Sequence, residues 1–285
     1  MRAAVVQMVS TDNVTDNFQI ADELIRQTAL EGAQLIVLPE NFALFSSSKL
    51  LEASQQEDAS AGPIRSFLAT TAREHGVWLV GGSLPLPAAA QKVYAASFVF
   101  DPNGIERACY RKVHLFDAEV GDAQGRYRES DTLAAGDEVV SLETPFGKLG
   151  LSICYDLRFP ELYRALFQQG VDLVTVPSAF TERTGRAHWQ PLLQARAIEN
   201  CCYVLAPNQG GQHTSKRATW GHSMIVDPWG KVLAECEEGV GFAIAEIDLA
   251  YLRELRQRMP VHAHQRIKVP EGDAALTIPI EAAEG

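Results

Sequence analysis

The stretch LSICYDLRFPELYR, residues 151–164, joins an apolar run to a helical pattern through a short polar segment. The apolar run ends at Cys154 and predicts a buried strand. Pro160 opens a helical segment that Gly170 ends, which is the proline-first, glycine-last arrangement typical of helices. Another apolar run, 171–177, follows at once. The stretch therefore predicts a strand, a helix and a second strand, with polar residues gathered where the first strand ends.

Apolar runs and helical patterns continue on both sides of this stretch. Most runs are apolar without alternation, as in strands that are covered on both faces. Turn sequences at 101–104 and 227–230 predict hairpins, and segments 84–92 and 117–131 are interpreted as loops. Helical patterns alternate with the early strands, and hairpins dominate in the later part of the chain. This order predicts an α/β fold with mixed sheets and helices outside. The predicted strands lie in 3–8, 33–39, 77–83, 95–100, 149–154, 171–177, 201–207, 222–227 and 242–248, and the predicted helices in 15–31, 63–75, 160–169 and 186–200.

Composition and charge limit the partners of the chain. It has 285 residues, 46% of them hydrophobic, and a net charge of −11. This negative charge argues against a nucleic acid partner, because phosphates attract cationic patches. No run approaches the ~20 apolar residues of a membrane span, and the N-terminal run is too short for a signal peptide. Five cysteines, an odd number without disulfide spacing, favour a reduced, cytoplasmic protein.

The chain shows no internal division. Because no long linker rich in proline, glycine or serine interrupts it, residues 1–270 are predicted to form a single domain. Residues 271–285 are acidic and rich in small side chains, and they are interpreted as a C-terminal tail, either disordered or packed as an extension. The motifs of zinc peptidases, zinc fingers and P-loops are missing, so no metal or cofactor is expected. His262 and His264 are interpreted as a solvated pair rather than a metal site.

Cys154 has two interpretations. A cysteine that ends an apolar strand is most often a small core residue. Its position is also typical of a nucleophile. Active sites in α/β folds lie at the carboxyl ends of strands, and the N-terminus of the following helix stabilises a thiolate. A nucleophile needs a base and an oxyanion donor. Glu40, which ends the run QLIVLPE, and Lys112, in CYRKVHLFD, offer these groups, although each also fits an ordinary exposed charge.

Three motifs together resemble those of the nitrilase superfamily, the carbon–nitrogen hydrolases with a Glu-Lys-Cys triad. They are LPENF around Glu40, YRKVHLFD around Lys112 and LSICYDLRFPELYR around Cys154. Their order and spacing match the family, and the similarity runs from residue 2 to about residue 266. Glu129, in YRESDTL, resembles the additional active-site glutamate of the family.

The resemblance implies an α-β-β-α sandwich and an amidase that works through a cysteine thioester without a cofactor. Cys154 would be the nucleophile and Glu40 the general base, while Lys112 and the backbone N–H of Tyr155 would hold the oxyanion. Glu129 would orient the lysine or the substrate. Members of the family pair their sandwiches, so a homodimer or a higher homo-oligomer is expected.

Further stretches resemble one branch of the superfamily. HLFDAEV, TGRAHWQPLLQARAIENCCYV and KRATWGHSMIVDPWG are similar to the deaminated glutathione amidases of the Nit branch. The implied reaction converts this small amide to 2-oxoglutarate and cysteinylglycine. Alternatives are an ω-amidase acting on α-ketoglutaramate, another aliphatic amidase, a nitrilase or a carbamoylase. A non-catalytic binding protein is a further alternative, against which the complete set of four site residues argues.

Basic residues gather after the run VTVPSAFTE in an otherwise acidic chain. Such an island suits a substrate that carries carboxylates, which arginine binds in a bidentate manner. Alternatively, these arginines pair with Glu182, Glu199 or a partner chain. Phe180 and Trp220 are either pocket walls or core residues. The predicted substrate-binding residues are Arg183, Arg186, His188, Phe180 and Arg217, and His213 and Lys216 belong to the same basic group.

Overall fold

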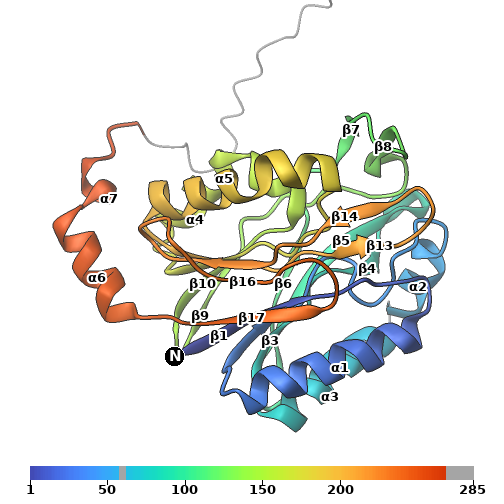
Figure 1. The fold of residues 1–285 in the computed structure, drawn as a ribbon, viewed down its shortest axis with the longest axis horizontal. Coiled ribbons are helices and arrows are strands. Elements are labelled where there is room, and N and C mark those ends of the chain that lie inside the picture. Colours follow the sequence, from blue (N-terminus) through green and yellow to red (C-terminus); the bar gives the residue numbers. More distant parts are fainter. Residues whose placement is uncertain (58–61, 268–285) are drawn as a thin grey trace, which may run out of the picture.

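Two β-sheets pack face to face between two layers of helices in the computed structural model, which describes residues 1–57 and 62–267 (Figure 1). This is the α-β-β-α sandwich that the three motifs imply. The predicted tail, 271–285, lies outside the described residues. Within the described ranges, no helix is long and apolar enough to cross a membrane.

The first sheet has seven strands in the order β17-β1-β2-β3-β5-β4, with β6 paired to β5. Its central strands β1, β2 and β3 run parallel, whereas β17, β4 and β6 pair with their neighbours in antiparallel fashion. The strands are β1 (Arg2–Gln7), β2 (Leu35–Val37), β3 (Trp78–Val80), β4 (Leu84–Pro87), β5 (Val93–Phe100), β6 (Glu106–Arg111) and β17 (Gly241–Glu246).

The second sheet has six strands in the order β16-β15-β12-β11-β10-β9. Here β10, β11 and β12 run parallel, and hairpins add the antiparallel strands at both edges. Both sheets are therefore mixed, as the sequence predicts. The strands are β9 (Ser141–Thr144), β10 (Gly147–Leu151), β11 (Leu173–Thr175), β12 (Tyr203–Ala206), β15 (Met224–Val226) and β16 (Val232–Glu235).

The continuous apolar runs reflect burial on both faces of each sheet. In β1, Ala3 and Val5 belong to the core between the sheets, whereas Ala4 and Val6 face the helices. Successive side chains of a strand point to opposite faces, so each face needs its own apolar partner. The core between the sheets also holds Cys154, at one end of the interface.

The outer helices cover the two sheets from opposite sides (Figure 1). α1 and α3 lie against the first sheet, while α4 and α5 lie over the second. Asn13 caps α1 by accepting the N–H of Thr15 at 3.1 Å. Pro63 opens α3, and Gly76 ends it at a left-handed φ of 64°. These helices are α1 (Val14–Leu30), α3 (Pro63–His75), α4 (Pro160–Gln168) and α5 (Glu182–Asn200).

Two predicted loops contain regular structure instead. Segment 84–92 includes β4, whose sequence LPLP is tolerated because β4 is an edge strand that pairs on one side only. Segment 117–131 contains a short hairpin of β7 (Asp117–Glu119) and β8 (Arg126–Arg128). The sequence also gave no indication of α2 (Leu50–Glu57) or α6 (Leu249–Arg258).

Candidate active site

Three side chains from separate strand ends meet at the carboxyl ends of the central strands. Glu40 follows β2, Lys112 follows β6 and Cys154 follows β10. Nζ of Lys112 lies 2.8 Å from Oε1 of Glu40, and both charges act electrostatically on the thiol of Cys154. The fold therefore brings together the residues at the centres of the three motifs.

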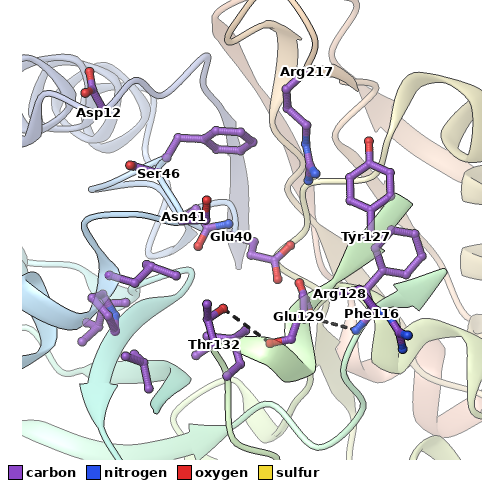
Figure 2. A pocket seen from close by; sticks show the side chains of 18 of the residues that line it. Asp12, Glu40, Asn41, Ser46, Phe116, Tyr127, Arg128, Glu129, Thr132 and Arg217 are labelled. Atoms are coloured by element: carbon purple, nitrogen blue, oxygen red, sulfur yellow. Dashed lines mark hydrogen bonds between the residues drawn. The ribbon is translucent and has the colours of Figure 1, made fainter. Parts of the chain in front are cut away.

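Glu129 approaches Lys112 from a different part of the chain. It starts the short 3-10 helix η2 (Glu129–Asp131), and its Oε2 lies 2.9 Å from Nζ of Lys112. The same oxygen accepts the backbone N–H of Phe116 at 2.8 Å, which fixes the carboxylate. Figure 2 shows Glu40 and Glu129 in the wall of one cavity. The fourth predicted site residue thus joins the other three.

Lys112 is a fully buried cation, with none of its side chain exposed. Burying an ammonium costs several kcal/mol unless the charge is paired. Burial by itself would lower the pKa of Lys112, but Glu129 and Glu40 outweigh it and hold that pKa well above its usual range. Lys112 is therefore charged at neutral pH, and its ammonium is fixed between two carboxylates.

Cys154 lies at a sharp turn between β10 and the 3-10 helix η3 (Cys154–Arg158). Its φ of 49° is left-handed, a region that non-glycine residues adopt at a cost and that gathers at functional sites. The turn is held by the N–H of Cys154, which donates to the carbonyl of Pro177 at 2.8 Å. The N–H of Tyr155 lies in the first turn of η3, where N–H groups have no intrahelical acceptor. This N–H therefore has no acceptor within the helix.

The thiol of Cys154 is protonated in the resting site. Burial and then the charge of Glu40 raise its pKa well above the usual range, and Lys112 only partly opposes them. The side chain is 8% exposed. A thiol of this kind attacks a carbonyl only if a base removes its proton during the attack. Glu40 is the nearby group that can accept it.

The backbone around Glu40 is fixed by two close approaches. The carbonyl of Glu40 accepts Nε2 of Gln209 at 3.0 Å, and the same amide donates to Oγ of Ser10 at 2.8 Å. On the other side, Gly82 lies so near Pro39 that a Cβ would collide with the Pro39 carbonyl oxygen. Its φ of 56° also suits glycine. These contacts explain how a strand-end carboxylate keeps one position.

The cluster opens into a cavity of about 450 Å³, a size typical of small-molecule sites. Glu40 and Glu129 belong to its wall, together with Phe116 and Tyr127 (Figure 2). The cavity therefore leads from the charged cluster to the loops around it. Within residues 1–57 and 62–267, no group of three His, Cys, Asp or Glu side chains is arranged to hold a metal ion.

Arg217 also lines this cavity and points into it in Figure 2. Its guanidinium lies 4.6 Å from the ring centre of Tyr127 and 5.5 Å from that of Phe45. In the described part of the chain, no carboxylate lies within 4 Å of it, and its buried Nε has no hydrogen-bond partner. The guanidinium is thus held by aromatic rings, with its charge unpaired.

The other predicted substrate-binding residues lie outside the cavity lining of the described chain. Arg183 donates to the carbonyl of Gly121 at 2.7 Å, and Arg186 pairs with Glu182 at 3.1 Å. Both arginines lie on the exposed side of α5, whereas Trp189 and Leu193 lie on its buried side. The remaining two are His188, 3.2 Å from Arg158, and Phe180, buried against Trp189.

Several cavity residues had no signal in the sequence. Phe45, in a loop, and Tyr127, in the short strand β8, come from distant parts of the chain, and Arg128 and Thr214 also contribute to the lining. Tyr127 is fixed by its hydroxyl, which donates to Asp122 at 2.6 Å. The one available sign was the alternation of aromatic and basic residues around Tyr127, which fits a hairpin edge equally well.

Comparisons with known proteins identify the chain as an amide-hydrolysing enzyme. The chain belongs to the carbon–nitrogen hydrolase family, whose model matches residues 2–257. This membership agrees with the three motifs and with the arrangement of Glu40, Lys112 and Cys154.

Named relatives are similar over nearly the whole chain. A deaminated glutathione amidase from Synechocystis is 49% identical over 267 residues, covering 92% of this chain and 97% of that protein. The deaminated glutathione amidase from Homo sapiens is 44% identical over 268 residues, covering 92% and 81%.

Solved structures show the same fold. Nit3 of Saccharomyces cerevisiae, a member of branch 10 of the nitrilase superfamily, is 32% identical with a TM-score of 0.84, covering 94% of this chain and 97% of that one. The NitFhit protein of C. elegans is 41% identical with a TM-score of 0.85, covering 93% of this chain and 65% of that longer one.

Proposed function

We propose that this enzyme hydrolyses deaminated glutathione to 2-oxoglutarate and cysteinylglycine through a thioester on Cys154. The observation that carries the chemistry is the Lys112 ammonium, which contacts both Glu40 and Glu129 and acts electrostatically on the buried thiol of Cys154. The substrate is proposed from the relatives that bear this name and from the unpaired cation of Arg217 in the cavity.

Acylation begins when Glu40 takes the proton of the Cys154 thiol and the sulfur attacks the amide carbon. The carbonyl oxygen becomes an oxyanion, held by the Lys112 ammonium and the N–H of Tyr155. When this intermediate collapses, the carbon–nitrogen bond breaks and Glu40 returns the proton to the leaving amine. The products of this step are the free amine and an acyl-thioester on Cys154.

Deacylation repeats the same steps with water as the nucleophile. Glu40 removes a proton from water, which attacks the thioester carbon, and Lys112 again stabilises the oxyanion. The carbon–sulfur bond then breaks, the acid leaves and the thiol regains its proton. Glu129 keeps the Lys112 ammonium in place through both steps, because it binds the lysine independently of Glu40, at 2.9 Å.

Arg217 is proposed to bind a carboxylate of the substrate. Deaminated glutathione carries a 2-oxo acid at one end and a glycine carboxylate at the other. An arginine held between two rings loses little further freedom when it binds such a group. Arg183, Arg186 and His188 have other partners, so the proposal assigns the carboxylate to Arg217.

The substrate proposal is tested by comparing kcat/KM on deaminated glutathione, α-ketoglutaramate and glutamine. The highest value is expected for deaminated glutathione. A strong preference for α-ketoglutaramate would instead make the enzyme an ω-amidase. Alkylation of the thiols, located by mass spectrometry, separates an enzyme from a binding protein, since reaction at Cys154 that substrate protects against supports catalysis.

We also propose that the protein is a cytoplasmic homodimer. Ile198 on α5 and Trp229 in the turn before β16 are 47% and 61% exposed, and Gly230 lies against Ile198. Apolar side chains gathered on one surface favour association with a second copy. Light scattering on the purified protein tests this, and a Trp229→Glu variant that stays dimeric would place the interface elsewhere.

A further inference from the structure

The proposed catalytic residues come from two different sheets. Glu40 and Lys112 follow strands of the seven-stranded sheet, whereas Cys154 follows β10 of the six-stranded sheet. Apolar side chains fill the space between the sheets, and apolar packing is non-directional. The sulfur and the ammonium must nevertheless meet the same carbonyl group. A directional contact between the two sheets at this point would fix their separation.

Asp156 makes such a contact. Its side chain is fully buried and its two oxygens have four donors around them. Oδ2 accepts the hydroxyl of Tyr110 at 2.7 Å and the backbone N–H of Ile153 at 2.8 Å. Oδ1 accepts the backbone N–H of His114 at 3.0 Å and lies 2.7 Å from ring Nδ1 of the same residue.

These donors belong to both halves of the site. Ile153 directly precedes Cys154 in the turn after β10 of the second sheet, whereas Tyr110 and His114 lie two residues before and two residues after Lys112. The ring of His114 also stacks on Phe159 at 3.7 Å, just beyond the nucleophile turn. One carboxylate therefore ties the turn that carries the sulfur to the segment that carries the ammonium.

We propose that Asp156 is the positioning residue that fixes the Lys112 ammonium relative to the Cys154 sulfur. Its side chain is fully buried and its oxygens face the protein groups named above, so it acts through Lys112 and Cys154 rather than on the substrate. The inference rests on the roles proposed above for these two residues. It assigns to the aspartate of the CYD sequence a role separate from those of the triad.

The carboxylate cannot be replaced by an amide at this position. Each oxygen of Asp156 faces one backbone N–H, that of Ile153 or that of His114. Asparagine has one acceptor oxygen, so in either orientation its NH2 group would face a backbone N–H. The contact to Ile153 or the contact to His114 is therefore lost. We expect the two sheets to move apart at this point while the surrounding apolar core stays the same.

The test begins with Asp156→Asn in the full-length enzyme. We expect kcat on deaminated glutathione to fall about 10²-fold, the cost of a displacement of about 1 Å in an active site, with KM changed less than about threefold. Asp172→Asn is the matched control. Asp172 also accepts a backbone N–H, that of Lys148 at 3.0 Å, but it precedes β11 and lies at the opposite end of the sheet. The kcat of Asp172→Asn should stay near the wild-type value, although this variant should lose about as much thermal stability as Asp156→Asn.

A second readout follows the thiol itself. The charges that act on Cys154 are Glu40, Lys112 and Glu129, and only Lys112 favours the thiolate. The pH midpoint of Cys154 alkylation by iodoacetamide should therefore rise in Lys112→Met. If Asp156 acts through Lys112, Asp156→Asn raises the midpoint in the same direction, and the double variant shows no further rise.

The results separate three cases. Wild-type kcat and alkylation midpoint in folded Asp156→Asn would overturn the inference while leaving the proposed function intact. Turnover in Cys154→Ala would overturn the proposed function itself. If Asp156→Asn does not fold, Tyr110→Phe removes one donor and leaves both backbone contacts. This variant should lose about fivefold in kcat, within the range for one hydrogen bond, and an unchanged kcat would contradict the inference.

Discussion

Two cations serve the same cavity in opposite ways. Lys112 is fully buried between two carboxylates at 2.8 and 2.9 Å. Arg217 is held by the rings of Phe45 and Tyr127 and has no carboxylate within 4 Å in the described residues. The charge of Lys112 is balanced by the protein before any substrate arrives, whereas the charge of Arg217 is available to a ligand. The first arrangement suits the reaction and the second suits recognition.

The difference has a physical basis in how each cation is stabilised. A buried ammonium needs opposite charges, because desolvation costs several kcal/mol. A guanidinium between rings gains about 0.5–2 kcal/mol from each cation–π contact without losing its net charge. Removing Lys112 should therefore impair every amide substrate, and removing Arg217 should impair only those that carry a carboxylate.

Lys112→Met should have the largest effect among the cavity variants. Loss of an oxyanion donor typically lowers kcat by 10²–10³-fold, and we expect about 10³-fold here because the two carboxylates also lose their partner. The loss should be similar for deaminated glutathione and for a neutral aliphatic amide. Steady-state kinetics on both substrates measure it. A loss confined to the carboxylate-bearing substrate would reverse the assignment of the two cations.

Glu129→Gln should have the next largest effect. It removes one charge from Lys112 while an amide oxygen remains to accept the N–H of Phe116. A hydrogen bond between charged groups contributes about 1.5–3 kcal/mol, so kcat should fall about 10–100-fold. The control is Glu182→Gln, which changes an exposed glutamate paired with Arg186 and should leave kcat within about twofold. An unchanged kcat in Glu129→Gln would show that Glu40 alone positions the ammonium.

Arg217→Gln should weaken one substrate class only. We expect kcat/KM on deaminated glutathione to fall about 10–100-fold, mainly through KM, since one charge-assisted contact is lost. Hydrolysis of a neutral aliphatic amide should stay within about twofold. Arg183→Gln is the matched control, because Arg183 belongs to the same predicted substrate-binding set but donates to the carbonyl of Gly121. Equal losses on both substrates would mean that Arg217 shapes the cavity instead of binding a carboxylate.

His213 should give the smallest effect, on stability. It stacks on Phe45 at 3.8 Å, and Nδ1 and Nε2 lie 2.8 and 2.7 Å from Ser10 O and Thr219 Oγ1. Burial, and to a lesser extent Arg217, lowers the pKa of His213 from 6.5 to about 4. Between these pH values the unfolded chain binds the proton and the folded one does not, so stability falls as pH drops. His213→Asn should show a shallower fall in Tm from pH 6.5 to 4, and an identical slope would contradict the assignment.

The sequence predicted the parts of the site that are carried by local patterns. Cys154 and Glu40 each end an apolar run, but these runs also fitted a core cysteine and an exposed acid. The resemblance of the three motifs to the nitrilase superfamily named the cluster before the fold was known. The mixed strand order and the helices 63–75 and 160–169 followed from apolar runs, turns, prolines and glycines, whereas the pairing of two sheets in a sandwich followed from the family resemblance. These features depend on residues close together in the chain.

The residues of the cavity wall that are proposed to bind the substrate could not be predicted from local patterns. Arg183 and Arg217 look alike in sequence, and only the fold shows that one donates to a backbone carbonyl while the other lies between two rings. Phe45 and Tyr127 come from a loop and a three-residue strand that are distant in the chain and too short for a periodic pattern. The prolines of 84–87 likewise predicted a loop, because the sequence does not reveal that this segment is an edge strand.

The central claim is that the acyl group of the substrate passes through the sulfur of Cys154. The most direct test is rapid quenching with deaminated glutathione followed by mass spectrometry of the peptide that contains Cys154. We predict a 2-oxoglutaryl thioester on Cys154 within the first turnover, no adduct on the other four cysteines, and no turnover in a folded Cys154→Ala variant. Turnover in Cys154→Ala, or steady hydrolysis by the wild type with an acyl group on a different residue, would contradict the account.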